Sequence, residues 1–354
     1  MKKKKYIILG IVIFIIALLI GVIAYANHML NKINYTEWDD SQTTEIEEVE
    51  IDTEEIKNLT KLNPDDVHIK EVDPLDSIPD ISNILLIGEE NIHKDKRGRT
   101  DSMMILTINK IDKSIKLTSL MRDSYVKIPN YKDNRLNAAY SIGGVPLLKE
   151  TIETNYGITL DNTVLVNFKT FEKIIDILGG VDIELTQNEC DYLNTQNFVS
   201  KDNRILKPGI NTLNGNQALG YARIRYVKGI DGELNDFGRT NRQRTVLKTI
   251  FNKYKKSDLN TLLKLMNEVL PYITTDISKS DIINYLTAIV SMMPDEIETF
   301  RLPIDNGYEA VSIRQMAVLN LDWDKNREAL KNFIYNNSTN TKNTSNTQDT
   351  SDTN

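Results

Sequence analysis

Cysteine is almost absent from this 354-residue chain, and histidine and tryptophan are rare. With Cys190 as its single cysteine, the chain can form no intramolecular disulfide, so a folded domain must be stabilised by an ordinary hydrophobic core. The histidines His28, His68 and His93 are dispersed and lack metal-ligand spacing, which argues against a zinc site. The sequence also lacks a Gly-x-x-x-x-Gly-Lys loop, a Gly-x-Ser-x-Gly elbow and a Gly-x-Gly-x-x-Gly fingerprint. Nucleotide-dependent and serine-hydrolase functions therefore lose their main support.

The chain has one long apolar run, from Tyr6 to Tyr25, and this run contains no charged residue. About 20 residues at roughly 1.5 Å each are enough to cross a bilayer core of roughly 30 Å, which predicts a transmembrane helix. Lysines precede the run and an acid-rich segment follows it. The positive-inside rule then places residues 1–5 in the cytoplasm and the rest of the chain outside the cell membrane. A cleaved signal peptide is the alternative, but its apolar region would exceed the usual span of roughly 7–15 residues.

Charge and composition divide the remainder of the chain. Removing the four N-terminal lysines from the formal charge of −7 leaves −11 outside, so the chain as a whole should not attract nucleic acid or anionic lipid. Residues 26–80 are polar and acidic and read as an extracellular stalk. Residues 336–354 form an Asn/Ser/Thr-rich tail that cannot bury a core, which predicts disorder. One folded domain is expected over residues 81–335.

Within that domain, apolar runs with strand and helix periods alternate. Strands are predicted at Asn83–Ile87, Met103–Ile108, Ile115–Met121 and Val181–Leu185. Helices are predicted from Pro146 to Gly157, over Phe168–Leu178 and around Ile282–Val290. This alternation indicates a layered α/β domain with a mixed central sheet.

The segment YARIRYVKGIDGELNDFGRTNRQR concentrates arginines in an otherwise acidic protein. Arg223 and Arg225 are two apart in a β-type stretch, so both should leave the same face of a strand. Arg239, Arg242 and Gln243 have the i, i+3, i+4 spacing of one helix face. Guanidinium groups match phosphate oxygens, and the pattern therefore predicts a polyphosphate site. A solvated basic helix is the alternative, which the acidic surroundings disfavour.

Carboxylates and further arginines stand at the ends of the predicted strands. Glu90 follows the first strand and Asp101 begins the second. Carboxylates at adjacent strand ends can hold Mg²⁺ or Mn²⁺, which bridges phosphate oxygens, although surface acids alone are more often without function. Arg122, Asp123 and Arg135 lie at loop positions after the third strand. Together with the arginine segment, this set suits a pyrophosphate bound with its metal.

The chain resembles the LytR-CpsA-Psr family of Gram-positive cell-wall proteins. The resemblance runs in order through NILLIGEE, GRTDSMMILTINK, LTSLMRDSYVKIP, NRLNAAYSIGG, FKTFEKIIDILGGVDIEL, LNGNQALGYARIRY and DFGRTNRQR. It implies a three-layer α/β/α domain that transfers a phosphate-linked glycopolymer, such as teichoic acid or capsule, from a polyprenyl-pyrophosphate carrier. The acceptor would be a peptidoglycan hydroxyl, usually the 6-hydroxyl of N-acetylmuramic acid.

The same resemblance assigns roles to individual residues. It implies that Glu90 and Asp101 hold the metal, although the family usually has Gly-Ser-Asp where this chain has Gly-Glu-Glu. Asp236 matches the acid of the family's Asp-Phe-Gly-Arg motif. Asp123 and Asp236 are both candidates for the general base, and the acceptor could also be activated without either. Catalytic roles would fall on Arg122, Asp123, Arg223, Arg225 and Asp236. The pyrophosphate-binding set would be Arg122, Arg135, Arg223, Arg225, Arg239 and Gln243. Arg242 is added to it because its spacing places it on the same helix face as Arg239 and Gln243.

A lipid carrier also requires an apolar groove. The helices Phe168–Leu178 and Phe251–Tyr254 could line one, but their apolar faces are more typical of an ordinary core. Three other functions stay open: a pyrophosphatase with water as acceptor, a non-catalytic wall-polymer-binding protein, and a transcription attenuator or regulator. The last would need a cytoplasmic nucleic-acid-binding face, against which the predicted topology argues.

Overall fold

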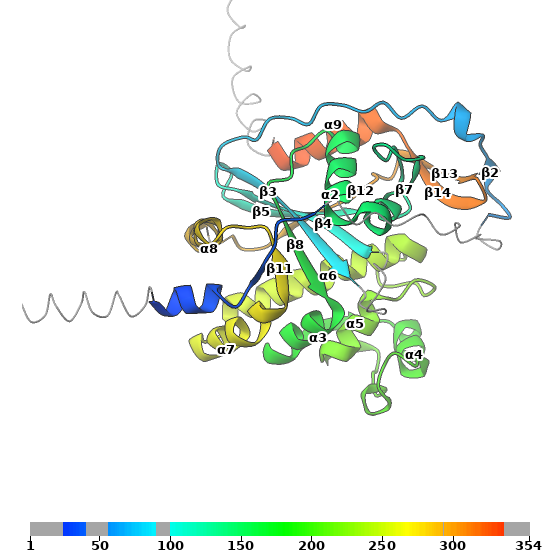
Figure 1. Ribbon diagram of the computed structural model, residues 1–354. Coiled ribbons are helices and arrows are strands. Elements are labelled where there is room, and N and C mark those ends of the chain that lie inside the picture. The colour runs from blue at the N-terminus through cyan, green and yellow to red at the C-terminus, as the bar shows by residue number, and fades with distance from the viewer. Residues whose placement is uncertain (1–23, 40–55, 90–99, 293, 336–354) are drawn as a thin grey trace, which may run out of the picture.

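The computed structural model describes residues 24–39, 56–89, 100–292 and 294–335 (Figure 1). The predicted membrane span, apart from its last two residues, lies outside these ranges, as do residues 1–5, Glu90 and the tail. Within the described ranges, no helix combines the length and the apolar character needed to cross a membrane.

A seven-stranded mixed sheet forms the centre of the fold. Its strands, in spatial order, are β1 (Asn34–Tyr35), β11 (Ile273–Thr275), β8 (Asn162–Asn167), β3 (Ile81–Glu89), β4 (Thr100–Asn109), β5 (Ser114–Leu120) and β12 (Glu298–Leu302). The pairs β1–β11, β8–β3 and β5–β12 are parallel, and the other three are antiparallel. The predicted mixed sheet is confirmed. Strands β3 and β4 contain the first two predicted strands, and β5 contains the third except for Met121.

Helices cover both faces of this sheet (Figure 1). On one face, α2 (Leu136–Tyr156) and α9 (Trp323–Tyr335) bury the largest core cluster, which includes Leu85 and Ile105 of the central strands. On the other face, α6 (Asn235–Lys256) and α8 (Lys279–Met292) pack against strand residues such as Met104. Because side chains alternate along a strand, a sheet buried on both faces needs apolar residues at nearly every position, which explains the continuous apolar runs.

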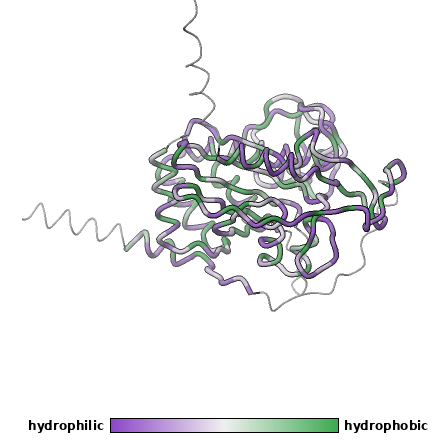
Figure 2. Tube along the Cα trace, turned by 90° about the horizontal axis from the view of Figure 1, so that it is seen from above, coloured by the Kyte–Doolittle hydropathy of each residue, from purple (hydrophilic) through white to green (hydrophobic). Residues whose placement is uncertain are grey.

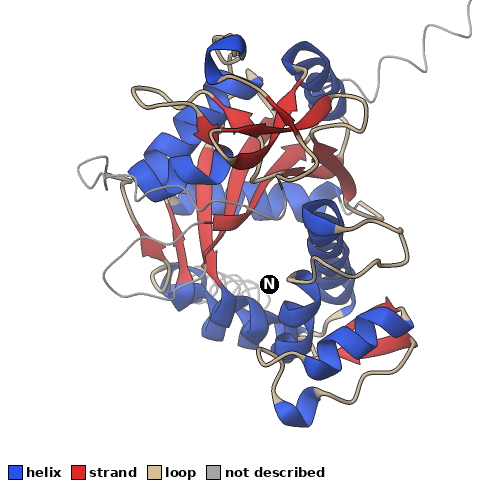
Figure 3. Ribbon diagram, turned by 90° about the vertical axis from the view of Figure 1, so that its right-hand side faces the viewer, coloured by secondary structure: helices blue, strands red, loops and turns tan. Residues whose placement is uncertain are grey.

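A smaller unit beside the sheet has its own core (Figure 3). It is built from α3 (Phe168–Ile177), β9 (Val181–Leu185), α4 (Gln187–Thr195), η2 (Lys201–Asn203), β10 (Gly209–Leu213) and α5 (Gly215–Ala222). The remaining elements are β2 (Thr60–Lys61), η1 (Pro64–Asp66), β6 (Tyr125–Val126), β7 (Asn134–Arg135), α7 (Leu259–Val269), η3 (Leu270–Tyr272), β13 (Tyr308–Ile313) and β14 (Met316–Leu321). Figure 2 shows hydrophobic and hydrophilic residues interspersed along the described trace.

Glycines end the helices where the sequence predicted. Gly157 has φ 69° and ψ 39° at the end of α2, the left-handed conformation that glycine adopts without steric cost. Gly180, with φ 91°, follows α3, and a Cβ there would come within 2.9 Å of the Leu213 carbonyl oxygen. Helix α2 is interrupted at Gly144, so the predicted helix beginning near Pro146 is its second half.

The prediction of an acidic stalk over residues 26–80 is wrong for the described parts of that segment. Met29, Leu30 and Ile33 are buried, and β1 pairs with β11 in the main sheet. Strand β2 likewise pairs with β13. Acidic composition misled the sequence interpretation, because these contacts are made by backbone pairing and a few apolar residues. The folded domain therefore begins well before Ile81.

Candidate active site

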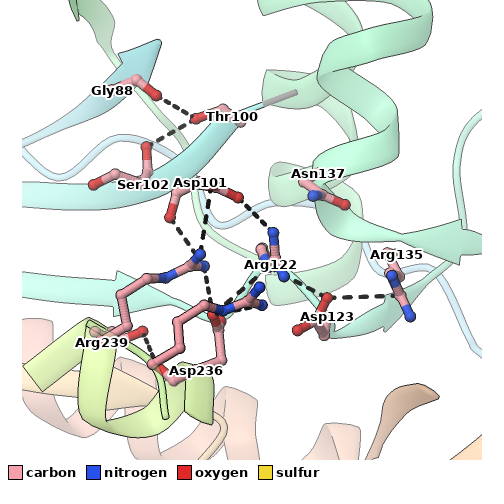
Figure 4. A network of polar contacts seen from close by, with 12 residues as sticks. Gly88, Thr100, Asp101, Ser102, Arg122, Asp123, Arg135, Asn137, Asp236 and Arg239 are labelled. Atoms are coloured by element: carbon pink, nitrogen blue, oxygen red, sulfur yellow. Dashed lines mark hydrogen bonds and ion pairs between the residues drawn. The ribbon is translucent and has the colours of Figure 1, made fainter. Parts of the chain in front are cut away.

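Charged residues gather where β4 begins and β5 ends (Figure 4). The two strands are antiparallel, with Met103 opposite Leu120, so Asp101 and Arg122 emerge at the same edge of the sheet. Arg122 Nη1 donates to Asp101 Oδ1 at 2.6 Å, and Arg122 Nε lies 3.5 Å from Asp123 Oδ1. The fold therefore brings Asp101 and Arg122 together, and Asp101 is paired with an arginine.

Asp236 is the centre of this cluster. It lies in the first turn of α6, where the helix dipole favours a negative charge, and is 6% exposed. Its Oδ1 contacts Arg239 Nη2 and lies 3.6 Å from both Arg122 Nε and Arg225 Nη2. Arg239 also approaches Asp101, with Nη1 3.5 Å from Oδ2. One buried carboxylate thus holds three arginines from three separate segments close together.

Asp101 and Asp123, two of the three acids beside Arg122, have pKa values that are shifted in opposite directions. Burial alone would raise the pKa of Asp101, but Arg239 and Arg122 outweigh it and hold the pKa below its ordinary value. Burial and the neighbouring Asp236 carboxylate raise the pKa of Asp123 to about 6, against the opposing effect of nearby arginines. Burial would lower the pKa of Arg122, but its three acidic neighbours raise it, so Arg122 stays charged.

Several polar atoms in the cluster are buried without a hydrogen-bond partner among the described residues. They are Arg122 Nε, Arg239 Nε, Asp123 Oδ1 and both carboxylate oxygens of Asp236. Arg122 Nε, Asp123 Oδ1 and Asp236 Oδ1 still take part in the ion pairs described above, whose geometry falls outside that of a hydrogen bond. The two guanidinium donors are suited to a phosphate oxygen.

A cavity of about 400 Å³ opens directly beside these charges. Asp101, Arg223, Arg225, Arg239 and Gln243 line one part of it. Most of the other lining residues are apolar: Leu86, Ile87, Met104, Val166, Phe168, Phe171, Ile174, Phe198, Leu219, Ala222, Leu247 and Ile250. Gly88, Ser102 and Asn167 complete the lining. The cavity is therefore polar beside the arginines and otherwise predominantly apolar.

The apolar lining corrects one prediction about the helices. Phe168, Phe171 and Ile174 of α3 face the cavity, whereas their periodicity had favoured ordinary core. Ile175 of the same helix is fully buried in the core of the smaller unit. Phe251 of α6 packs in a core cluster under the sheet, as predicted for that helix. Sequence periodicity cannot separate a face that packs on protein from one that lines a cavity.

Arg223 and Arg225 reach the site from a loop, so their predicted strand is wrong. Helix α5 ends at Ala222 and Arg223 is its C-cap, with φ −102° and ψ −7°. The Arg223 guanidinium lies 5.4 Å from the ring centre of Phe168 and 5.3 Å from that of Phe198. The capping box at Asn214, which begins α5, was the sequence signal that a helix precedes the arginines.

Arg242 does not line the cavity, so the structure separates it from the other predicted pyrophosphate ligands of α6. It is 3% exposed, and Nε donates to Glu189 Oε1 at 2.8 Å. Arg135 also lies apart from the cavity lining: it donates to the Ala317 carbonyl at 3.1 and 2.8 Å and lies 3.6 Å from Asp123 Oδ1. Glu189 was missed because a helix N-terminal acid usually serves only as a cap.

The described part of the predicted metal site is Asp101. No group of three or more His, Cys, Asp or Glu residues with metal-binding geometry occurs among the described residues. Mg²⁺ commonly uses one or two carboxylates and completes its shell with substrate phosphates and water. Asp101, which lines the cavity beside the arginines, fits such a shared site, and Glu90 lies outside the described residues.

The chain is similar to several known proteins in sequence and in fold. The chain is 32% identical over 258 residues to regulatory protein MsrR of Staphylococcus aureus, covering 71% of this chain and 74% of MsrR. It is 29% identical over 224 residues to the polyisoprenyl-teichoic acid–peptidoglycan teichoic acid transferase TagU of Enterococcus faecalis, covering 61% and 69%. A structure of TagT bound to LI-WTA superimposes with a TM-score of 0.57 at 25% identity, covering 75% and 97%. Residues 40–332 match the LytR_cpsA_psr family, and the chain belongs to that family.

Proposed function

We propose that this protein transfers the phosphosugar end of a polyprenyl-pyrophosphate-linked glycopolymer to a peptidoglycan hydroxyl. The observation that carries the proposal is the junction of a largely apolar cavity with an arginine cluster, which suits a ligand with an apolar chain and a polyanionic head. The names of two relatives support it: TagU is a teichoic acid transferase, and TagT binds LI-WTA. The acceptor would be the 6-hydroxyl of N-acetylmuramic acid.

The apolar part of the cavity would hold the polyprenyl chain. Each buried methylene contributes roughly 0.8 kcal/mol, so a few isoprene units in contact with α3 and α6 would hold the carrier firmly. Phe168, Phe171 and Leu247 supply part of this surface. The chain's proposed anchor, Tyr6–Tyr25, would keep the domain on the outer side of the cell membrane, where such a carrier is embedded.

The arginines would hold the pyrophosphate where the cavity becomes polar. Arg223, Arg225 and Arg239 line this end with Gln243, and Arg122 is attached to them through Asp236. Phosphoryl transfer is catalysed chiefly by positioning and by offsetting charge on the transferred and departing groups. A preformed arginine cluster fits this requirement because its like charges are already held together by buried acids.

In the proposed reaction, the acceptor hydroxyl oxygen attacks the phosphorus that bears the sugar. A new P–O bond forms to the acceptor, and the P–O bond to the bridging oxygen of the pyrophosphate breaks. Polyprenyl monophosphate leaves with the bridging oxygen. The hydroxyl proton passes to a carboxylate, for which Asp123 and Asp236 are the candidates. The raised pKa of Asp123, about 6, suits a base that works near neutral pH.

Asp101, with Glu90, would hold Mg²⁺ or Mn²⁺ in this scheme. A bound cation would offset negative charge on the pyrophosphate oxygens. Asp101 also forms ion pairs with Arg122 and Arg239, so it would serve both the arginine cluster and the cation.

Product analysis tests the proposal against its alternatives. Full-length protein in detergent micelles is incubated with a synthetic polyprenyl-pyrophosphoryl disaccharide, Mg²⁺ and peptidoglycan oligomers, and the products are weighed by mass spectrometry. Transfer predicts an acceptor heavier by one phosphosugar unit. Free phosphosugar would indicate a pyrophosphatase, and unchanged substrate would indicate a binding protein or a regulator, as the name of MsrR suggests for that relative.

A further inference from the structure

The loop of residues 223–234, between α5 and α6, carries two of the site arginines and forms no strand. Its internal backbone hydrogen bonds are few: Gly232 N donates to the Gly229 carbonyl at 3.0 Å, and Ile224 N reaches back to the Tyr221 carbonyl at 3.2 Å. A loop with so few bonds of its own must be fixed from outside if its side chains are to be held in a productive geometry.

Helix α6 fixes this loop around Arg225. Asn235 N donates to the Arg225 carbonyl at 2.6 Å. Arg242 Nη1 donates to the Ile224 carbonyl at 3.3 Å, and Nη2 donates to the Val227 carbonyl at 2.7 Å. The carbonyls of Ile224 and Val227 bracket Arg225, so the backbone at this arginine is held on both sides by the fork of one guanidinium.

Glu189 holds that guanidinium in turn. Its Oε1 accepts from Arg242 Nε at 2.8 Å, while its Oε2 accepts from the backbone N–H of Thr186 at 2.9 Å in the capping box of α4. Glu189 is 1% exposed and Arg242 is 3% exposed. A buried pair of this kind is sensitive to the loss of either partner, because the remaining charge is left unpaired.

Two glycines leave room for the pair. A Cβ on Gly229 would lie 3.0 Å from both Arg242 Nη2 and Glu189 Oε1. A Cβ on Gly238 would lie 2.9 Å from Arg242 Nη1 and 2.7 Å from the Glu233 carbonyl oxygen. Both the loop and α6 therefore approach the guanidinium too closely for a larger residue.

We propose that Arg242, paired with Glu189, is a positioning residue that holds the 223–234 loop so that Arg225 faces Asp236 and the cavity. Helix α6 would then serve the site in two ways: Arg239 and Gln243 line the cavity, and Arg242 fixes the loop that brings Arg225 to the same place. The part of the proposal that concerns substrate rests on the proposed function, whereas the part that concerns the loop does not.

Hydrogen exchange measured by mass spectrometry tests the loop directly and needs no substrate. Arg242→Lys keeps the charge beside Glu189, but an ammonium cannot reproduce the fork that reaches two carbonyls. Glu189→Gln is the second variant, in case the first folds poorly. Arg327→Gln is the matched control, because Arg327 is another buried arginine that donates to backbone carbonyls, those of Asn155 and Lys70.

The expected result is faster exchange in peptides covering residues 223–234 in both pair variants, by about tenfold or more, with strands β3 to β5 unchanged. The Arg327→Gln variant should leave the loop unchanged. Loop exchange equal to that of the unsubstituted protein in both folded pair variants would overturn the proposal.

A double-mutant cycle tests whether the loop matters through Arg225. Binding of inorganic pyrophosphate with Mg²⁺ is measured by calorimetry for Arg225→Ala, Arg242→Lys and the combination. If Arg242 acts by placing Arg225, each single change should weaken binding by about tenfold, and the double variant should be little weaker than either. Additive losses of about a hundredfold would contradict the positioning role, because Arg242 would then act independently of Arg225.

The two experiments separate failure of this inference from failure of the proposed function. If the unsubstituted protein transfers no phosphosugar but the pair variants loosen the loop, the positioning role holds and the reaction assignment fails. If transfer occurs and the loop is unaffected by either variant, the reaction assignment holds and the positioning role fails.

Discussion

Replacing Asp123 by Asn should make the protein more stable at neutral pH while reducing transfer. Asp123 is held beside the Asp236 carboxylate in a buried site, and burial together with that neighbour raises its pKa from 3.8 to about 6. A carboxyl group with a raised pKa prefers its neutral form in the folded state. Asn resembles that neutral form in size and shape, so the substitution removes an unfavourable charge.

The size and sign of the effect follow from the two pKa values. Below about pH 4 the carboxyl is neutral in both folded and unfolded chains, and Asp and Asn should differ little. Between about pH 4 and 6 only the unfolded Asp ionises, so the unsubstituted protein loses about 1.4 kcal/mol of stability per pH unit relative to the variant. Above about pH 6 the difference is constant, at about 3 kcal/mol in favour of Asn.

Unfolding of both proteins in urea, followed by tryptophan fluorescence from pH 4 to 8, measures this difference. The stability gap should open between about pH 4 and 6 and then stay level. A gap that is independent of pH would show that Asp123 titrates normally. An Asn variant less stable than the unsubstituted protein at pH 8 would show that the arginines around Asp123 favour its charge more than burial opposes it. If Asp123 is the base, transfer by the unsubstituted protein should also fall about tenfold at pH 5.

Four further predictions test other parts of the site. Arg225→Lys keeps the positive charge but loses the two-pronged donor geometry of the guanidinium. Transfer should fall about 10- to 150-fold, because a hydrogen bond to a charged group contributes roughly 1.5–3 kcal/mol. A near-normal rate would show that Arg225 contributes only its positive charge. Ile174 lines the cavity, so Ile174→Trp should displace about two methylenes of the polyprenyl chain and raise KM for the polyprenyl substrate about tenfold. Lys169→Trp, on the exposed side of α3, should leave KM unchanged. Asp101→Ala should abolish metal-dependent transfer and Glu90→Gln should weaken it, and full activity of the Gln variant would remove Glu90 from the metal site. Removal of residues 336–354 should leave the melting temperature unchanged, and a large drop would show that the tail packs on the domain.

Local sequence signals were sufficient for much of the sheet and for the helix ends. The apolar runs of β3, β4 and β5 are long because the sheet is covered on both faces, and such runs are visible without any knowledge of topology. Gly157, Gly179 and Gly180 follow the ends of their helices and have positive φ. Because this conformation favours glycine at a single position, it can be predicted from the local sequence alone. The strand-end acid Asp101 and Arg122 could be placed together because antiparallel neighbours share an edge.

Other features depend on partners far away in the sequence. Arg242 lies about 60° from Arg239 around the helix, and Gln243 lies about 40° away on the opposite side, so the three need not face one ligand. The buried Glu189 carboxylate binds the Arg242 guanidinium and so fixes its direction. No spacing rule in the sequence predicts this contact. The alternation around Arg223 and Arg225 mimics a strand, yet α5 precedes it and the chain continues as a loop. Strands β1 and β2, which precede Ile81, join sheets through backbone pairing. The acidic side chains of these segments give no sequence signal of that pairing.

Oxygen isotope labelling tests the central claim most directly. The full-length protein, in detergent with Mg²⁺, a synthetic polyprenyl-pyrophosphoryl disaccharide and peptidoglycan oligomers, is incubated in water enriched in ¹⁸O, and every phosphate-containing product is analysed by mass spectrometry. Transfer to the peptidoglycan hydroxyl predicts a phosphodiester-linked product and polyprenyl monophosphate, neither containing ¹⁸O from water. Incorporation of ¹⁸O into free phosphosugar, with no linked product, would show that water is the acceptor and would contradict the proposed ligase activity.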